Sequence, residues 1–290
     1  MKLKTNISED IKCLSRQALE SLDSSTTAYK ALKKALTRPV DYMRYAEFSA
    51  ILDCLELQPD TLVLDVGSPQ WFCVYLASQH PKTDFVYINI IDSEIEPFQQ
   101  ISKALGLQNL QYLKEDVREL SFDSESFDQV ISISVIEHIA PASGGDCAAL
   151  KEINRVLKPE GKLHLTVPYK DRGNVVYVDG DVYERKGDVS TFFAREYDAA
   201  SFSALVEDSE FSAESLNYII EKPGLLALDY YEWGPGKSLH FIKYLPKLLK
   251  VTEKVFNHSF EKVLAQRNLH VVSEPGNRLV NLAASLKPSR

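Results

Sequence analysis

The stretch from Glu115 to Pro168 constrains the fold of this chain more than any other. It opens with the acidic residues EDV, continues through the apolar run FDQVISIS, and ends in KPEGKLHLTVP. Short, nearly continuous apolar runs joined by a helical pattern are typical of strands buried on both faces of a parallel sheet. We therefore expect a layered α/β domain in which helices connect parallel strands.

The same alternation of strand and helix patterns extends toward the N-terminus. The expected strands lie at 61–66, 84–91, 110–114, 129–134 and 162–167. Alternation at this spacing implies βαβ units with right-handed crossovers. Ligands of such sheets bind beyond the carboxyl ends of the strands, so the residues directly after each strand are the candidates for a site.

The flanking segments carry different patterns. Residues 1–58 are helical and polar, which predicts an N-terminal helical extension. Residues 175–178 and 181–184 alternate around Asp179-Gly180, which predicts a β-hairpin insertion near 173–186. Beyond a core of 59–221, we expect a helical insertion over 222–270 and the last strand of the sheet within 271–290.

Composition excludes several classes of protein. A net charge of −8 and a pI near 5.4 argue against a broad phosphate-binding surface, so we expect no nucleic-acid partner. The four cysteines form no CxxC pair, and we expect no metal. The sequence contains no apolar run of about 18 residues and no apolar stretch like that of a signal peptide near its start. These features predict a cytoplasmic protein.

Residues 60–168 as an ordered set resemble the class I S-adenosylmethionine-dependent methyltransferases, in particular the type 11-like group. The resemblance rests on the LDVG loop at Leu64–Gly67, the acidic EDV loop, the FDQV strand and the Lys158–Gly161 turn. It implies a Rossmann-like, seven-stranded, mostly parallel sheet with helices on both faces, and S-adenosylmethionine as the cofactor.

The resemblance places the cofactor contacts at Asp65, Gly67, Ser68, Asn89, Ile90, Asp92, Asp116, Val117, Ser132 and Ile133. The sequence departs from the family pattern in two places, the loop at residues 68–70 and position 89. Ser68, Pro69 and Gln70 stand where later glycines are usual. Asn89 stands where an acid normally binds the ribose hydroxyls, so either Asn89 takes that role or Asp92 reaches back. Asp116 matches the residue that holds the adenine amino group.

Two readings are open for His138. Histidine titrates near neutral pH, so His138 is a candidate general base; alternatively, the Glu137-His138 pair packs beside the cofactor. The residues after the fifth expected strand are candidates for acceptor contacts, and the mixture of arginine and tyrosine suits a polar, anionic or sugar-like acceptor. These candidates are Tyr169, Arg172, Tyr183, Arg185, Arg195 and Tyr197.

The segment 239–265 has lysines on one helical face and apolar residues nearer the other. This pattern suits peripheral contact with a membrane surface, and it also suits a cap helix packed on the domain, which is the commoner case. The function expected from all these features is methyl transfer to a small-molecule, sugar-linked or lipid-linked acceptor, with oxygen favoured over nitrogen. The alternatives are a catalytically silent binding or scaffold subunit and a nicotinamide-dependent enzyme; the missing GxGxxG counts against the latter.

Overall fold

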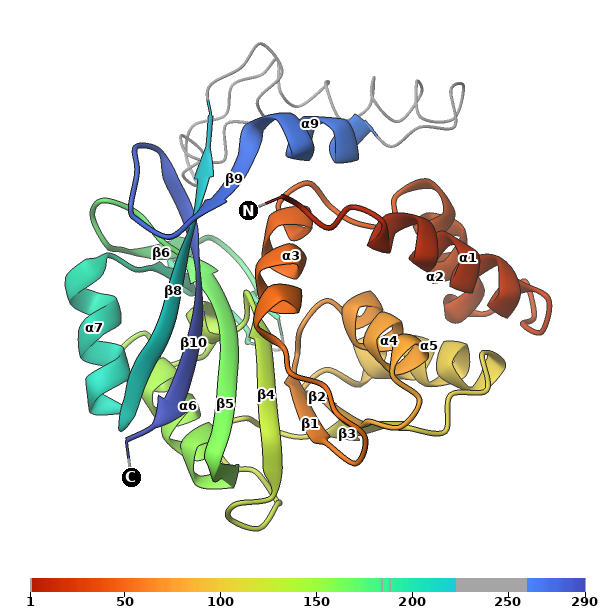
Figure 1. Cartoon of the computed structure of the whole chain (residues 1–290), viewed down its shortest axis with the longest axis horizontal. Coiled ribbons are helices and arrows are strands. Elements are labelled where there is room, and N and C mark those ends of the chain that lie inside the picture. The colour runs from red at the N-terminus through yellow and green to blue at the C-terminus, as the bar shows by residue number, and fades with distance from the viewer. Residues whose placement is uncertain (1, 184, 188, 223–259, 290) are drawn as a thin grey trace.

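A parallel core of five strands, extended by three antiparallel ones, organises the molecule (Figure 1). The computed structural model describes residues 2–183, 185–187, 189–222 and 260–289. Within them, an eight-stranded sheet has the order β3-β2-β1-β4-β5-β10-β8-β9. Its strands are β1 (Leu62–Val66), β2 (Asp84–Asn89), β3 (Leu110–Lys114), β4 (Phe127–Ile133), β5 (Leu157–Pro168), β8 (Phe211–Glu221), β9 (Leu269–Val272) and β10 (Leu279–Pro288). The expected α/β fold with a mostly parallel sheet is confirmed.

The sheet has one strand more than the seven expected. The additional strand is β9, which pairs antiparallel with β8 at the edge of the sheet. Leu269 and Val271 are buried and alternate with half-buried neighbours, as in a strand with one covered face. The sequence LHVV is too short to separate from the end of the preceding helix by pattern alone, because a helix and a strand of four residues have similar apolar content.

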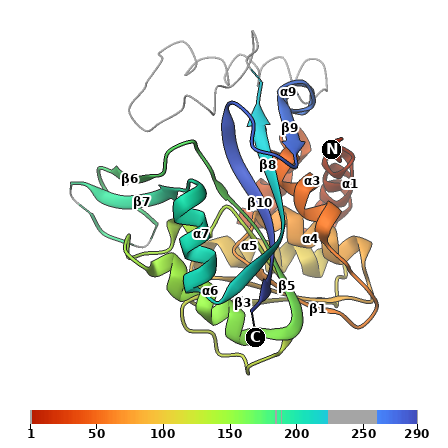
Figure 2. The same ribbon diagram turned by 60° about the vertical axis from the view of Figure 1, so that its left-hand side comes forward.

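Helices cover both faces of the sheet, as expected. They are α1 (Ile7–Leu19), α2 (Thr27–Thr37), α3 (Arg44–Cys54), α4 (Gln70–Gln79), α5 (Asp92–Ala104), α6 (Gly145–Val156), α7 (Ala199–Asp208) and α9 (Phe260–Asn268), with a short 3-10 turn η1 (Ile136–His138). Figures 1 and 2 show α1–α5 on one side and α6 and α7 on the other. Each side has its own hydrophobic core, and the N-terminal helices contribute a large part of the first.

The expected hairpin has a different partner strand. Strand β6 (Asn174–Val178) pairs antiparallel with β7 (Thr191–Glu196), and residues 181–183 belong to neither strand. The prediction of a second strand at 181–184 is therefore wrong. The reason is burial: Phe192 and Ala194 of β7 are covered together with Val176 of β6, which gives this pairing an apolar face.

The Lys158–Gly161 turn is absorbed into β5. Strand β4 pairs with β5 at Phe127–Leu157 and next at Gln129–Lys162, so the segment between bulges out of the register. The polypeptide therefore passes from α6, which ends at Val156, straight into β5, which begins at Leu157.

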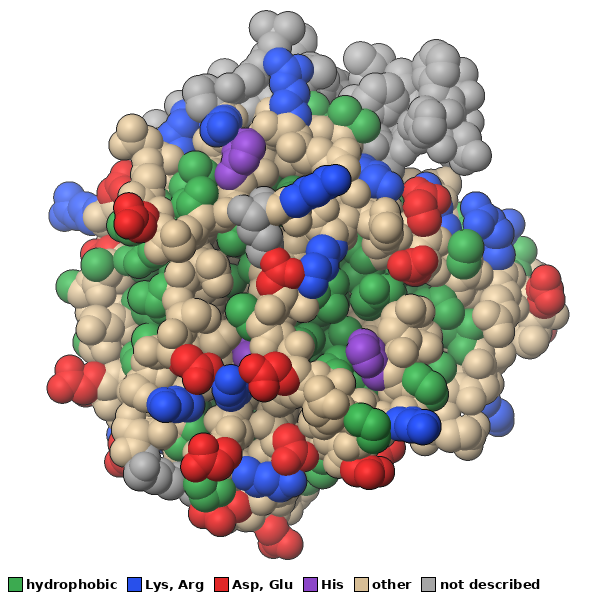
Figure 3. Space-filling view, in the orientation of Figure 1, with side chains coloured by type: hydrophobic (Ala, Val, Ile, Leu, Met, Phe, Trp, Pro, Cys, Tyr) green, Lys and Arg blue, Asp and Glu red, His purple; other side chains and the backbone are tan. Residues whose placement is uncertain are grey.

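Most of the segment 239–265 lies outside the described residues. Its last part belongs to α9, where Leu264 and Ala265 are buried against the N-terminal helices. Within the described ranges, no helix is both long enough and apolar enough to cross a membrane. On the face drawn in Figure 3, acidic and basic side chains are interspersed.

A buried carboxylate fixes α3 to the sheet. The Glu47 side chain is 0% exposed. Its Oε2 accepts a hydrogen bond from Arg44 at 2.6 Å. Its Oε1 accepts from Ser134, Thr166 and Asn281 at 2.5, 2.9 and 2.7 Å. These donors lie just after β4, on β5 and on β10, so one side chain connects the N-terminal extension to three neighbouring strands.

We expect Glu47→Ala to lower the free energy of unfolding by about 3–5 kcal/mol, because it leaves Arg44 without its buried partner. Urea denaturation measures the change. Asp181→Ala is the matched control, because the Lys186–Asp181 pair is exposed and such pairs contribute about 0–1 kcal/mol. Equal effects of the two substitutions would contradict the role of Glu47.

Candidate functional site

A cavity of 540 Å³ opens at the carboxyl ends of β1–β4, where the strand rule places a ligand. Its size falls within the range of about 300–1,000 Å³ common for small-molecule sites. The loop between β6 and β7 and the side chain of Arg44 complete its wall. A larger cavity of 720 Å³ lies between α7, β8 and β10, away from these strand ends. We take the smaller cavity as the candidate site, because it lies at the carboxyl ends of the parallel strands.

The loop after β1 needs only one glycine. Gly67 has a φ of +62°, and an added Cβ would lie 3.4 Å from Val135. Ser68 is fully buried: its amide donates to Asp65 Oδ1 at 3.0 Å, and its hydroxyl accepts from the Ile133 amide at 3.1 Å. Ser68 thus ties the loop to β4, a contact that glycine could not make. The departure from the glycine-rich pattern preserves the local geometry.

The loop after β2 holds a carboxylate that the sequence reasoning missed. The Asn89 oxygen accepts from the Ile91 amide at 2.9 Å, and its Nδ2 donates to Glu94 Oε2 at 3.1 Å. Glu94 Oε2 also accepts from Gln70 at 3.1 Å, and all three side chains line the cavity. Asp92 instead pairs with Lys114 at 2.6 Å and does not line the cavity. The acid on this side is therefore Glu94, in the first turn of α5.

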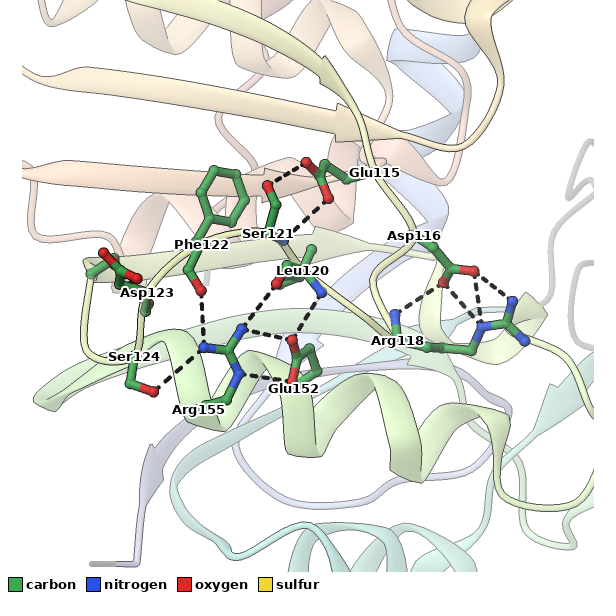
Figure 4. A network of polar contacts seen from close by, with 11 residues as sticks. Glu115, Asp116, Arg118, Leu120, Ser121, Phe122, Asp123, Ser124, Glu152 and Arg155 are labelled. Carbon is green, nitrogen blue, oxygen red and sulfur yellow. Dashed lines mark hydrogen bonds and ion pairs between the residues drawn. The ribbon is translucent and has the colours of Figure 1, made fainter.

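The loop after β3 carries Asp116 at the cavity wall (Figure 4). The Arg118 guanidinium binds both of its oxygens, with Nε to Oδ1 at 3.0 Å and Nη2 to Oδ2 at 2.5 Å. These hydrogen bonds hold the pKa of Asp116 below its usual range. Arg118 also donates to the Ala140 carbonyl at 2.8 Å, so it bridges the loops after β3 and η1.

Two side chains of helix α6 form hydrogen bonds with the segment that follows this acidic loop. Arg155 donates to the Phe122 and Leu120 carbonyls at 2.9 and 3.1 Å. Glu152 accepts from the Leu120 amide at 2.8 Å (Figure 4). Helix α6 therefore holds the segment at Leu120–Phe122, which directly follows the acidic loop.

The 3-10 turn after β4 places two titratable groups side by side. Glu137 is 1% exposed, its Oε2 has no partner among the described residues, and burial raises its pKa to about 8. His138 lines the cavity, and burial lowers its pKa. At pH 7 both side chains are therefore mainly neutral.

The hydrogen bond of His138 determines its tautomer. Its Nδ1 lies 2.8 Å from the Phe193 carbonyl oxygen, which can only accept, so Nδ1 carries the proton. In the neutral ring, Nε2 then has the free lone pair. The Tyr183 and Phe193 rings contact the imidazole edge-on, with centroids 5.4 and 4.9 Å away, and restrict its rotation. These contacts fix the orientation of the His138 ring, and its Nε2 can accept a hydrogen bond.

The cavity brings together about half of the residues expected at the site. Those that line it are Gly67, Ser68, Asn89, Ile90, Asp116, Val117, Ile133, His138, Tyr183 and Arg185. Asp65 and Ser132 are fully buried behind it. Arg172 is exposed elsewhere. Tyr169 lines the larger cavity instead.

Arg195 and Tyr197 form hydrogen bonds to other parts of the protein and do not line the cavity. Arg195 donates to the carbonyl of Ile139 at 2.9 Å and pairs with Asp146 at 3.1 Å. The Tyr197 hydroxyl donates to the same carboxylate at 2.8 Å. Neither residue lines the candidate cavity, so its acceptor side is formed by the β6–β7 loop rather than by the end of β7.

The residues present fit S-adenosylmethionine, the cofactor that the resemblance implies. Gly67 has a φ of +62°, which favours glycine, and without a side chain its backbone on the cavity wall stays open to close approach. Glu94 offers a carboxylate for a diol, and Asp116 with the Val117 amide offers an acceptor and a donor for the edge of adenine. Asp65 Oδ2 is buried without a partner among the described residues. No cluster of metal-ligating side chains occurs in the part of the chain that the structure describes.

We expect Glu94→Gln to weaken binding of S-adenosylhomocysteine about tenfold, because an amide accepts hydrogen bonds from hydroxyls less strongly than a carboxylate. Calorimetry with S-adenosylhomocysteine, adenosine and adenine measures this. The loss should appear with the two ribose-containing ligands and vanish with adenine. Glu96→Gln, an exposed position on the same helix, is the control. A loss with adenine as well would contradict a ribose contact.

The raised pKa of Glu137 predicts how stability depends on pH. The folded state holds this proton up to about pH 8, whereas the unfolded carboxyl loses it near its ordinary value of 4.5. Unfolding therefore releases a proton between these limits, and stability should fall as pH rises, by up to about 1.4 kcal/mol per pH unit. The negative charge of Glu47 raises the pKa of Glu137 further, whereas the positive charges of Arg44 and Arg195 lower it.

Glu137→Gln should remove this contribution. Relative to the natural chain, the variant should become more stable as the pH rises from 5 to 8, as followed by urea unfolding at each pH. Parallel curves for the two proteins would show that Glu137 ionises normally in the folded state.

Comparisons with known proteins agree with this architecture. Residues 64–165 match the family model described as a methyltransferase domain. The uncharacterized protein MJ0638 of Methanocaldococcus jannaschii is 30% identical over 140 residues, which are 48% of this chain and 54% of that protein. The match thus spans about half the length of this curated relative.

Solved structures share the fold at low identity. A putative methyltransferase complex with the Trm112 activator from Haloferax volcanii has a TM-score of 0.54 at 13% identity, covering 91% of this chain and 96% of that chain. The [4+2]-cyclase SpnF has a TM-score of 0.53 at 13% identity, covering 86% and 84%. The PH0226 protein of Pyrococcus horikoshii OT3 has a TM-score of 0.50 at 15% identity, covering 93% and 97%. At these identities the likeness establishes the fold alone.

Proposed function

We propose that this protein, whose residues 64–165 match a methyltransferase-domain model, transfers a methyl group from S-adenosylmethionine to a hydroxyl of a small acceptor. The observation that carries the proposal is the orientation of His138. Its Nδ1 proton is engaged by the Phe193 carbonyl, and its ring lines the cavity beside the expected cofactor residues. The lone pair on Nε2 is then available to the acceptor.

When bound, S-adenosylmethionine supplies an electrophilic methyl group on its sulfonium. Holding the acceptor in line with that group supplies much of the rate, so the protein acts mainly by positioning. Gly67, Glu94, Asp116 and the Val117 amide would hold the cofactor along the strand ends. The remaining chemical task is to remove the proton that the hydroxyl loses.

His138 suits that task. A hydroxyl is weakly acidic, so its attack is assisted by a neutral base within hydrogen-bonding distance. Burial and the cationic side chains of Arg44, Arg185 and Arg195 lower the pKa of His138, which keeps Nε2 unprotonated at neutral pH. Glu137 Oε1 lies 3.7 Å from Nε2, beyond hydrogen-bonding distance, so this carboxyl does not occupy the lone pair of Nε2.

The first test is ligand binding. The natural chain should bind S-adenosylhomocysteine in calorimetry; no binding at millimolar ligand would overturn the proposal. Release of S-adenosylhomocysteine from S-adenosylmethionine should then be followed with a panel of hydroxyl-bearing and amine-bearing small molecules.

We expect His138→Ala to lower the transfer rate to a hydroxyl by about 10²–10⁴-fold while changing affinity for S-adenosylhomocysteine little. The rate of the natural enzyme should fall only below about pH 6.5, since the lowered pKa delays protonation of the base. A variant that keeps the full rate, or a profile that falls on the alkaline side of pH 7, would remove His138 from the mechanism.

The same fold supports other chemistry, since SpnF is named a cyclase. Binding of S-adenosylhomocysteine without transfer to any acceptor in the panel would favour the alternative of a catalytically silent binding subunit. The tight engagement of Asp116 by Arg118 is the feature that favours this alternative, because the adenine amino group must compete for the same oxygens.

A further inference from the structure

The loop between β6 and β7 carries a cation into the cavity without a matching anion. Arg185 lines the cavity, and its Nη2 is buried with no hydrogen-bond partner among the described residues. Buried polar groups in folded proteins almost always have a partner, and an unpaired charged group is costly. An unpaired guanidinium nitrogen in a ligand cavity therefore points to a ligand group that pairs with it.

The guanidinium is held in place by its surroundings. Arg185 and Val182 exchange backbone hydrogen bonds of 2.9 and 3.0 Å, which close the loop into a tight turn. The Arg185 guanidinium carbon lies 5.3 Å from the centre of the Phe192 ring of β7. A cation against an aromatic face is attracted to it and loses freedom. The N–H donors of the Arg185 guanidinium are therefore held in one orientation.

The carboxylates of the cavity do not neutralise this charge. Glu94 accepts from Gln70 and Asn89, Glu115 accepts from Ser121, and Asp116 is bound by Arg118. Burial lowers the pKa of Arg185, and the nearby cations Arg118 and Arg195 lower it further, whereas Tyr183 raises it. The local field therefore favours an anion at this position.

We infer that the acceptor carries an oxyanion, a carboxylate or phosphate, that Arg185 binds, in addition to the hydroxyl that receives the methyl group. This inference rests on the proposed function, since it assigns the acceptor to the same cavity as His138. The planar guanidinium pairs with two oxygens at once, which fixes the orientation of the acceptor as well as its position. Tyr183, two residues away, packs on His138, so the anion site and the base are joined by one short loop.

Calorimetry of the S-adenosylhomocysteine-saturated protein tests the anion site without knowledge of the acceptor. The probes are acetate, inorganic phosphate, 4-hydroxybenzoate and its neutral counterpart 4-hydroxybenzamide. The natural chain should bind at least one of the three anions, and 4-hydroxybenzamide at least about tenfold more weakly than that anion. Acetate against phosphate distinguishes the two kinds of oxyanion.

Arg185→Gln should abolish the preference for anions, whereas Lys186→Gln, which alters a neighbouring side chain that is 91% exposed, should keep it. Equal responses of the natural chain and Arg185→Gln, including no response from either, would overturn the inference. The proposed function fails independently, through loss of S-adenosylhomocysteine binding. Anion binding that depends on Arg185 without any methyl transfer would retain the site and reject the reaction.

Discussion

The buried carboxylate of Glu47 is the interaction on which the arrangement of the site depends. It is removed from water and accepts hydrogen bonds from Arg44 on its own helix, from Ser134 just after β4, from Thr166 on β5 and from Asn281 on β10. A buried charge that loses its partners costs several kcal/mol, so helix α3 is stable only where these donors converge. That position brings Arg44 to the cavity wall and closes the sheet end against the N-terminal helices. An extension outside the parallel core thereby becomes part of the candidate site.

The two departures from the methyltransferase pattern that this chain resembles are compensated by neighbours in space. Ser68 replaces a glycine, yet its hydroxyl fastens the loop to Ile133 on β4. Asn89 replaces an acid, yet Glu94 brings a carboxylate to the same place and is held there by the Asn89 amide. In each case the new side chain makes a hydrogen bond to another part of the chain: Ser68 to the Ile133 amide, and Asn89 to the Glu94 carboxylate. The loops after β1 and β2 are thus more firmly held than the sequence motif alone indicates.

The central strands were predictable because their burial leaves a local signature. A strand covered on both faces must be apolar along its length, and β1, β2 and β4 follow this rule. The hairpin was not predictable in the same way. Alternation around Asp179-Gly180 marks a turn, but the partner of β6 depends on which later residues bury a common face, and this is a property of the packed chain. The edge strand β9 escaped detection because it is short and follows a helix directly.

The sequence by itself determined the α/β class, the strand ends that would form a site, and the residue types available there. Apolar periodicity and turn residues act over short distances, so they can be read without a structure. Only the tertiary structure decided that Glu94 rather than Asp92 lines the cavity, that Arg185 lines it while Arg195 bonds to the backbone after η1, and that His138 carries its proton on Nδ1. These outcomes depend on hydrogen bonds between residues far apart in the chain, such as that of His138 with Phe193, and on which side chains burial leaves without a partner.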